Sequence, residues 1–168
     1  SIAGLLAIYN AAMLGMLKHY SKKSDDSFIA AVKRLINIQI FIDLLILTVL
    51  LHFAGGIENP FVFYYAFHII IASILLSGKE SYFHATSAIT FFGLLLFLEY
   101  RGILPHYCLS GFIEHCNFQN GYYVLGTYFV FTTTLYLMVY MANYVSTLLK
   151  RTEQSLLKAN KALCQKDR

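Results

Sequence analysis

The residues best suited to bind a ligand in this sequence fall in one short string, residues 55–61. In order, the string reads Gly55, Gly56, Ile57, Glu58, Asn59, Pro60 and Phe61. Paired glycines permit a tight turn and the close approach of another group, and proline favours the first position of a new helix. Free N–H groups at a helix start bind carbonyl oxygens or anions, and Glu58 and Asn59 add an acceptor and a donor. We expect either a site for a flat amphipathic ring with carbonyl oxygens, such as a quinone, or a plain interfacial hairpin.

Histidines offer a second kind of chemistry on the same side of the chain. His52 precedes the string, and His106 lies in the polar region 100–121. Haem b can be held by two axial histidines at similar depth. His52 and His106 agree in depth, whereas His52 and His68 differ by about 10 Å if their helices stand upright. A haem sensor that uses His52 with His106 or His68 is therefore an alternative to the quinone site.

The same histidines also suit a transition metal. His52, His106 and His115 could bind zinc or copper together with Glu99 or Glu114. Isolated loop histidines, however, are commonly just solvated, and no C-x-x-C-H string for covalent haem attachment occurs. We keep a transition metal as an alternative and assign no residue as a metal ligand.

Two ionisable residues lie deeper, within apolar stretches. Asp43 lies ten residues before Phe53, and His68 lies eight residues after Pro60. At the rise of an α-helix, both sit about 12–15 Å below the same surface on adjacent helices. They could form a buried pair that relays a proton as a quinone changes redox state, or a purely structural pair that joins two helices.

The elements that must position these residues are membrane helices. The chain is 58% hydrophobic and 13% charged, and a bilayer needs about 20 apolar residues per helix. Five stretches come close, namely 2–17, 35–53, 60–77, 81–99 and 122–148. Backbone groups in lipid must be satisfied internally, which predicts helices. We therefore expect an all-α polytopic transmembrane bundle. The first stretch lacks a basic start and a cleavage site, so we expect the chain to begin inside a larger protein.

Lysine and arginine placement predicts the orientation. Twelve of the 13 basic residues fall in segments on one side of the predicted spans, and only Arg101 falls on the other. By the positive-inside rule, the basic side and the C-terminal tail face the cytoplasm. The net charge of +4 then reflects topology, and no nucleic-acid partner is expected.

The last span continues into a predicted stalk. Apolar and small residues recur with spacing 4-3-4-3-4, at Val145, Leu149, Thr152, Leu156, Ala159 and Leu163. This pattern is typical of a coiled-coil seam, and it predicts a parallel homodimer, although a single amphipathic helix on the inner leaflet is the alternative. We divide the chain into a transmembrane sensor domain, 1–148, and a cytoplasmic signalling helix, 149–168.

Cysteine positions leave one question open. Cys108 and Cys116 lie in the predicted outer loop, on the oxidising side where disulfides persist. They could form a disulfide or remain two free thiols.

The strings Asp43-Leu44-Leu45 and 51–61 resemble the membrane domain of RegB/PrrB-type redox-sensing histidine kinases. The hallmark of that family is Gly-Gly-x-x-Asn-Pro-Phe between two membrane helices, and all its specified residues are present. The resemblance implies a quinone ligand, the bacterial cytoplasmic membrane, and six spans, of which five are counted here. It also implies an attached kinase domain with its response regulator. The histidines and the two outer cysteines depart from the family pattern.

No catalytic motif accompanies these features. The chain contains no P-loop, no H-E-x-x-H string and no Ser-His-Asp order. We expect the input domain of a two-component histidine kinase, with no enzyme activity in this part of the protein. A structural or transport subunit is a further alternative, but matched broken helices, typical of transporters, are not evident.

Overall fold

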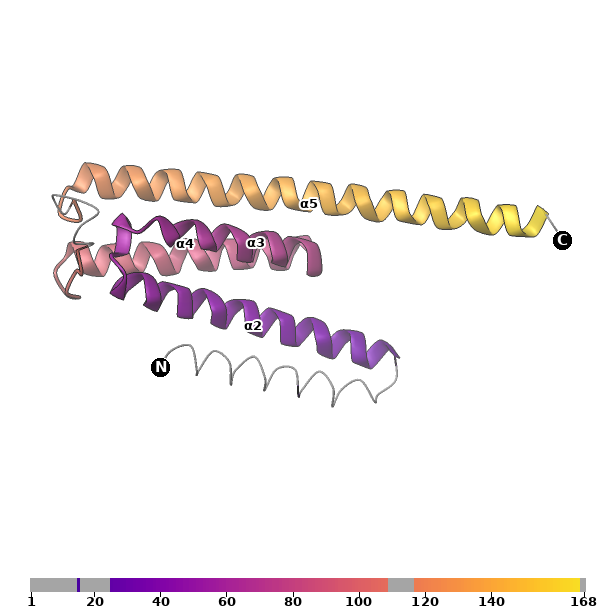
Figure 1. Cartoon of the computed structure of the whole chain (residues 1–168), viewed down its shortest axis with the longest axis horizontal. Coiled ribbons are helices and arrows are strands. Elements are labelled where there is room, and N and C mark those ends of the chain that lie inside the picture. The colour runs from indigo at the N-terminus through magenta and orange to yellow at the C-terminus, as the bar shows by residue number, and fades with distance from the viewer. Residues whose placement is uncertain (1–14, 16–24, 109–116, 167–168) are drawn as a thin grey trace.

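A computed structural model describes residue 15, residues 25–108 and residues 117–166. The elements within these ranges are α2 (Asp25–Phe53), the short 3-10 helices η1 (Gly56–Glu58) and η2 (Pro60–Phe63), α3 (Tyr64–Leu75), α4 (Gly78–Tyr100) and α5 (Gly121–Lys166). The four α-helices lie side by side with their axes nearly parallel, and α5 extends far beyond the others (Figure 1). The predicted all-α class is confirmed for the part of the chain that the structure describes.

Three helices are long and apolar enough to cross a bilayer. They are Phe28–Phe53, Gly78–Tyr100 and Gly121–Ala162, which confirms the spans predicted at 35–53, 81–99 and 122–148. The stretch predicted at 60–77 is a shorter apolar segment, Pro60–Leu75. It is shorter because the chain leaves the helical conformation at Leu76 and turns into α4. The stretch predicted at 2–17 lies outside the described residues, apart from residue 15.

The turn between α3 and α4 is fixed by a capping box. The Ser77 hydroxyl oxygen accepts from the Glu80 amide at 3.4 Å, and the Glu80 carboxylate accepts from the Ser77 amide at 2.8 Å. Two orphan amides at the start of α4 are thereby satisfied. This arrangement allows the chain to reverse direction between two membrane helices within a few residues.

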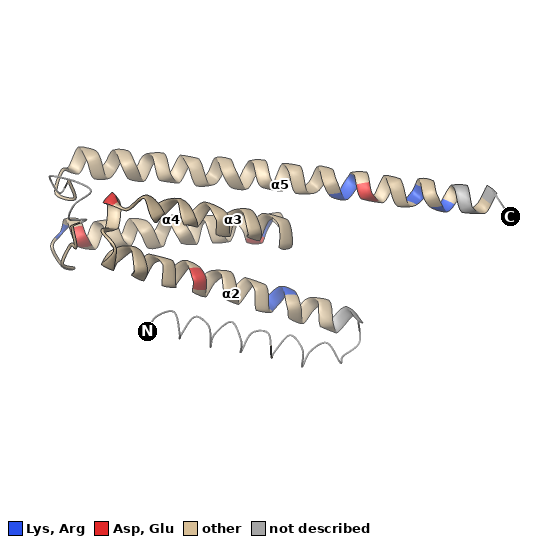
Figure 2. Ribbon diagram, viewed as in Figure 1, with Lys and Arg blue, Asp and Glu red and all other residues tan. Residues whose placement is uncertain are grey.

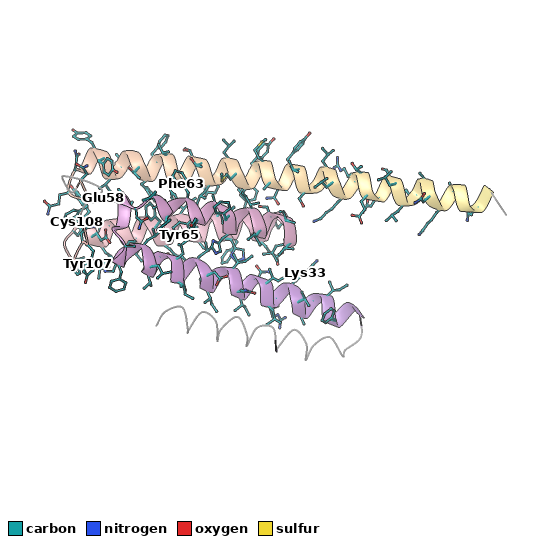
Figure 3. All side chains as sticks on the ribbon, viewed as in Figure 1. Lys33, Glu58, Phe63, Tyr65, Tyr107 and Cys108 are labelled. Carbon is teal, nitrogen blue, oxygen red and sulfur yellow. The ribbon has the colours of Figure 1, made fainter. Side chains whose placement is uncertain are left out.

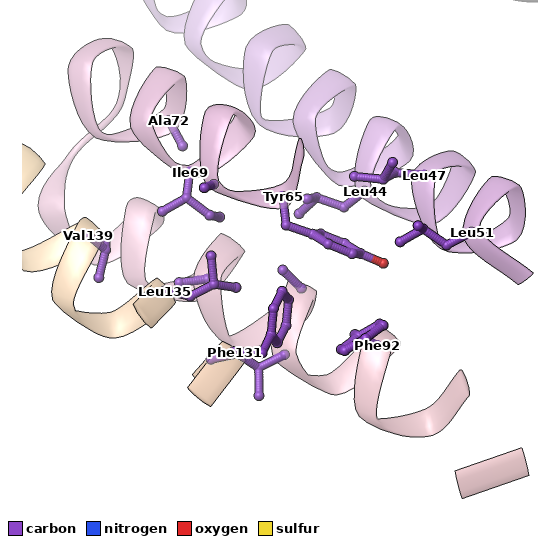
Figure 4. Packing of buried hydrophobic residues seen from close by; sticks show 14 of the residues in the cluster. Leu44, Leu47, Leu51, Tyr65, Ile69, Ala72, Phe92, Phe131, Leu135 and Val139 are labelled. Carbon is purple, nitrogen blue, oxygen red and sulfur yellow. The ribbon is translucent and has the colours of Figure 1, made fainter. Parts of the chain in front are cut away.

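An aromatic core joins all four helices (Figure 4). Tyr65 of α3, Phe92 of α4 and Leu44 of α2 are fully buried. The Phe131 ring of α5 lies 4.6 Å from the Phe92 ring and 5.4 Å from the Tyr65 ring, measured between centroids. Tyr65 is also tied to α2 by a 2.6 Å hydrogen bond between its hydroxyl and that of Thr48. The core therefore fixes the position of α5 relative to the other helices.

Charged side chains are distributed unevenly along the bundle. Basic residues occur in the first part of α2 and in the second half of α5, whereas the half of α5 beside the core carries none (Figure 2). Arg101, just after α4, lies at the opposite end of the bundle and packs over the Phe97 ring at 5.3 Å. Among the described residues, the basic side chains thus follow the predicted division.

Candidate functional site

The string at residues 55–61 forms a tight reversal between α2 and α3. Gly55 and Gly56 adopt φ angles of 109° and 52°, a region that favours glycine. The side chain of Asn59 accepts from the Phe61 amide at 2.8 Å and donates to the Ala54 carbonyl at 2.5 Å. Asn59 is buried, so both functions of its amide hold the hairpin closed. The Asn59 and Phe61 groups expected to contact a ligand are therefore used within the hairpin itself.

Glu99, in the last turn of α4, connects two histidines. Its Oε1 accepts from His52 Nδ1 of α2 at 2.8 Å, and its Oε2 accepts from His106 Nδ1 at 2.7 Å. The side chains of Glu99 and His106 are only 2% and 1% exposed, and that of His52 is 12% exposed. When the Glu99 carboxylate is ionised it only accepts hydrogen bonds, and in that state both imidazoles carry a proton on Nδ1.

A second buried carboxylate, that of Glu58, faces His106. Glu58 of η1 accepts from the Asn117 amide through Oε1 at 2.6 Å. Its Oε2 lies 3.8 Å from His106 Nε2. Neither of these last two atoms has a hydrogen-bond partner among the described residues. We refer to His52, Glu58, Glu99 and His106 as the His–Glu cluster.

Aromatic rings and backbone enclose this cluster. The His106 ring stacks on Phe118 with centroids 4.2 Å apart, and Tyr107 packs edge-on against His52 at 5.5 Å. Glu58, Tyr107 and Cys108 lie at the same end of the bundle (Figure 3). Cys108 is disulfide-bonded, and Cys116, which the sequence leaves open as its partner, lies outside the described residues. The segment that carries His106 is thus anchored on both sides of the histidine.

An apolar groove runs beside the cluster, between α2 and α4. Its volume is about 390 Å³, and its wall includes Leu45, Thr48, His52, Phe91 and Leu98. The size lies in the range of small-molecule sites. His52 thus lines the groove while its Nδ1 bonds Glu99.

The comparison with known protein families fits this architecture. A family model described as the PilS-like transmembrane domain matches residues 3–156. The chain belongs to this family. The PilS-like domain is a six-span membrane domain of the sensor-kinase type. No curated protein and no solved structure matched the chain. The closer resemblance to RegB/PrrB kinases stays a prediction.

The PilS-like domain brings together only part of the predicted site. His52, Gly56, Glu58 and His106 meet at the cluster, whereas Pro60 and Phe61 are exposed. Phe61 stacks on Tyr64, with ring centroids 5.2 Å apart.

Asp43 and His68 sit apart from the cluster. They interact electrostatically, but no hydrogen bond joins these two described residues. His68 Nδ1 instead bonds the Tyr64 carbonyl of its own helix at 2.9 Å. The proton relay predicted for Asp43 and His68 therefore has no direct hydrogen bond to support it.

Sequence reasoning missed the role of Glu99. We predict Glu99 only as a possible metal ligand, although an ionisable side chain at the end of a membrane helix is itself a signal of function. Among the described residues, no group of three or more His, Cys, Asp or Glu side chains is arranged to hold a metal ion. The haem alternative stays a prediction, and the Nδ1 atoms of His52 and His106 already bond Glu99.

A second polar network lies toward the other end of the PilS-like domain. Asn37 of α2 donates to Glu80 Oε1 at 2.7 Å and contacts His84 Nε2 through its carbonyl oxygen at 2.9 Å. His84 is buried. This network ties α2 to the start of α4, next to the turn where Gly78 packs near Asn143 of α5.

Proposed function

We propose that this PilS-like domain is the sensory input domain of a bacterial histidine kinase and responds to the redox state of membrane quinones. The family supports the sensor-kinase part of the proposal, and the distribution of basic residues supports a cytoplasmic C-terminus in the cytoplasmic membrane. The observation that carries the quinone part is the position of His52, between an apolar groove and the buried Glu99 carboxylate.

The groove suits the ring of a quinone or a quinol. It is apolar apart from Thr48 and His52, and it lies between membrane helices, where a lipid-soluble ligand has direct access. A few polar groups in an apolar site fix the orientation of a bound ligand. Here the available group is His52 Nε2, because Nδ1 is bound to Glu99.

Hydrogen bonding at His52 favours the reduced ligand. With Glu99 ionised, His52 donates its Nδ1 proton across the 2.8 Å contact to Glu99, and a neutral His52 ring then presents a lone pair at Nε2. That lone pair accepts from the hydroxyl of a quinol, but it cannot donate to the carbonyl of a quinone. Binding one redox form better than the other is what a ligand needs in order to shift a conformational equilibrium.

The path by which ligand binding would reach the kinase domain starts at the His–Glu cluster. Glu58 bonds the Asn117 amide, and Asn117 precedes α5, which runs unbroken from Gly121 to Lys166. A helix of this length spans about 70 Å. We propose that displacement of the cluster moves α5 and its dimeric stalk, and thereby an attached kinase domain that phosphorylates a response regulator.

A binding titration tests the ligand. Purified protein in lipid nanodiscs is titrated with a short-chain benzoquinol and with the matching benzoquinone, by calorimetry. We expect the quinol to bind about tenfold more tightly, the size of one hydrogen bond of about 1.4 kcal/mol. His52→Gln should remove the preference.

His68→Gln is the matched control, because His68 is also an intramembrane imidazole but bonds only its own helix. It should bind both ligands as the wild type does. Equal affinity of the wild type for quinol and quinone, or an unchanged preference in His52→Gln, would contradict the proposal.

A further inference from the structure

Two buried atoms of the His–Glu cluster face each other without a hydrogen bond. His106 Nε2 and Glu58 Oε2 are 3.8 Å apart, and the side chains that carry them are 1% and 0% exposed. Both atoms lack a partner among the described residues. Buried polar atoms are normally paired, so this facing pair requires an explanation.

The number of protons that the His–Glu cluster holds explains why this pair forms no hydrogen bond. With both carboxylates ionised and both imidazoles neutral, two negative charges are buried together. No lysine or arginine of the described residues forms an ion pair with Glu58 or Glu99; the ion pairs there involve only His52 and His106. In that state His106 Nε2 and Glu58 Oε2 are both acceptors and repel each other. One added proton between them removes a charge and turns the repulsion into a hydrogen bond.

We propose that the His–Glu cluster is a proton-binding site, in which one proton taken up between His106 and Glu58 locks the start of α5 to the hairpin. The proposal goes beyond quinone sensing and needs no quinone. It makes the domain responsive to the pH at the end of the bundle that carries the hairpin.

Among the described residues, the titratable groups that face this position come from several elements around it. α2 contributes His52, η1 contributes Glu58, α4 contributes Glu99, and the segment after α4 contributes His106 together with Tyr107, whose ring packs on His52. Of the described residues just before α5, Asn117 and Phe118 contact the cluster, through the Asn117 amide and the Phe118 ring, and neither group titrates.

The lock reaches α5 through a short run of hydrogen bonds. Glu58 Oε1 holds the Asn117 amide, and the Asn117 carbonyl accepts from the Asn120 amide at 2.9 Å. The Asn120 side chain in turn caps the amides of Tyr122 and Tyr123, in the first turn of α5. Protonation at His106 thus sets how firmly the first turn of α5 is held.

Hydrogen exchange of the peptide 117–124 tests the proposal, with protein in nanodiscs and without quinone. After correction for the chemical exchange rate, we expect protection to rise at least about tenfold between about pH 8 and pH 5, the window in which imidazoles change charge. An unchanged wild-type profile would overturn the proposal.

Two variants test the direction in which protonation changes the protection of this peptide. In Glu58→Gln, an uncharged amide can donate to His106 Nε2 without an added proton, so protection should be high and independent of pH. In His106→Asn, the amide still donates toward Glu99 but leaves no atom where Nε2 stood, so protection should stay low at both pH values. A wild-type pH response in either variant would overturn the proposal.

His68→Asn serves as the control, and it should retain the wild-type response. Adding or removing a metal ion tests whether the cluster binds a metal ion instead of a proton. If zinc chloride restores protection at pH 8 and a chelator abolishes protection at pH 5, the site binds a metal ion and the proton proposal is wrong.

Discussion

Gly56 lies directly against the carboxylate of Glu99. A Cβ atom at Gly56 would approach Glu99 Oε2 to 2.5 Å, and the φ angle of Gly56 is +52°. The φ angle is one that residues other than glycine rarely adopt, and an added Cβ atom would force the Glu99 carboxylate, which bonds His52 and His106, to shift. The second glycine of the string therefore makes room for the carboxylate that holds His52 and His106.

Replacing Gly56 and a control glycine distinguishes the effect of the contact with Glu99 from the effect of the positive φ angle. Gly56→Ala should lower the free energy of unfolding by about 2–4 kcal/mol, because strain at positive φ adds to a clash with Glu99. Gly102→Ala is the matched control, since Gly102 has a φ angle of +68° and nothing within 4 Å of its added Cβ. It should lose only about 1 kcal/mol. Denaturant unfolding in detergent micelles measures both, and equal losses would show that Glu99 plays no part.

The membrane helices are predictable from the sequence where local composition decides the structure. Long apolar runs have few options in a bilayer, so the spans at 35–53, 81–99 and 122–148 followed directly. The run at 60–77 gave a shorter helix, because η2 and the Ser77 cap depend on local hydrogen bonds rather than on apolarity.

The candidate site was predicted less completely. The sequence shows an asparagine at position 59 whether its side chain binds a ligand or closes the hairpin. Only the hydrogen bonds to Ala54 and Phe61 in the structure distinguish these roles. Glu99 could not be recognised as the link between His52 and His106, because that contact depends on where the segment after α4 folds back. Contacts between distant segments are the part of the site that apolar patterning does not encode.

Tyr65 provides a test of the core. Its hydroxyl is buried and bonds Thr48, which donates to the Leu44 carbonyl, so the tyrosine supplies the proton. Tyr65→Phe should cost about 0.5–1.5 kcal/mol of unfolding free energy. Tyr140→Phe, at a side chain that is 58% exposed, should cost almost nothing. A larger loss from Tyr140→Phe than from Tyr65→Phe would contradict the packing described here.

Asn37 should be more important than an asparagine that bonds only its own helix. Asn37→Ala leaves the buried His84 Nε2 without its partner and removes a donor from Glu80, so the free energy of unfolding should fall by about 1–3 kcal/mol. Asn143→Ala removes only a bond to the Val139 carbonyl and should have a smaller effect. Thermal unfolding in nanodiscs measures the difference, and indistinguishable transitions would argue against the network.

Glu99 should control the redox preference through His52. In Glu99→Gln, the amide can turn its N–H₂ group toward His52, which frees the imidazole to carry its proton on Nε2 instead. The expected tenfold preference for quinol should then fall toward equal affinity for quinol and quinone. Calorimetric titration of the variant measures this, and a preserved preference would show that Glu99 does not set the His52 tautomer.

The stalk offers a matched pair of neighbouring leucines. Leu156 lies on the predicted seam and Leu157 beside it, and they are similarly exposed, at 64% and 55%. If two copies pair through the seam, side chains at its positions face each other across the dimer. In a Cys164→Ser background, oxidation of Leu156→Cys in membranes should give a covalent dimer, whereas Leu157→Cys should give much less. Equal cross-linking of both variants on a non-reducing gel would favour random collision over a coiled coil, and no cross-linking of Leu156→Cys would remove the predicted seam.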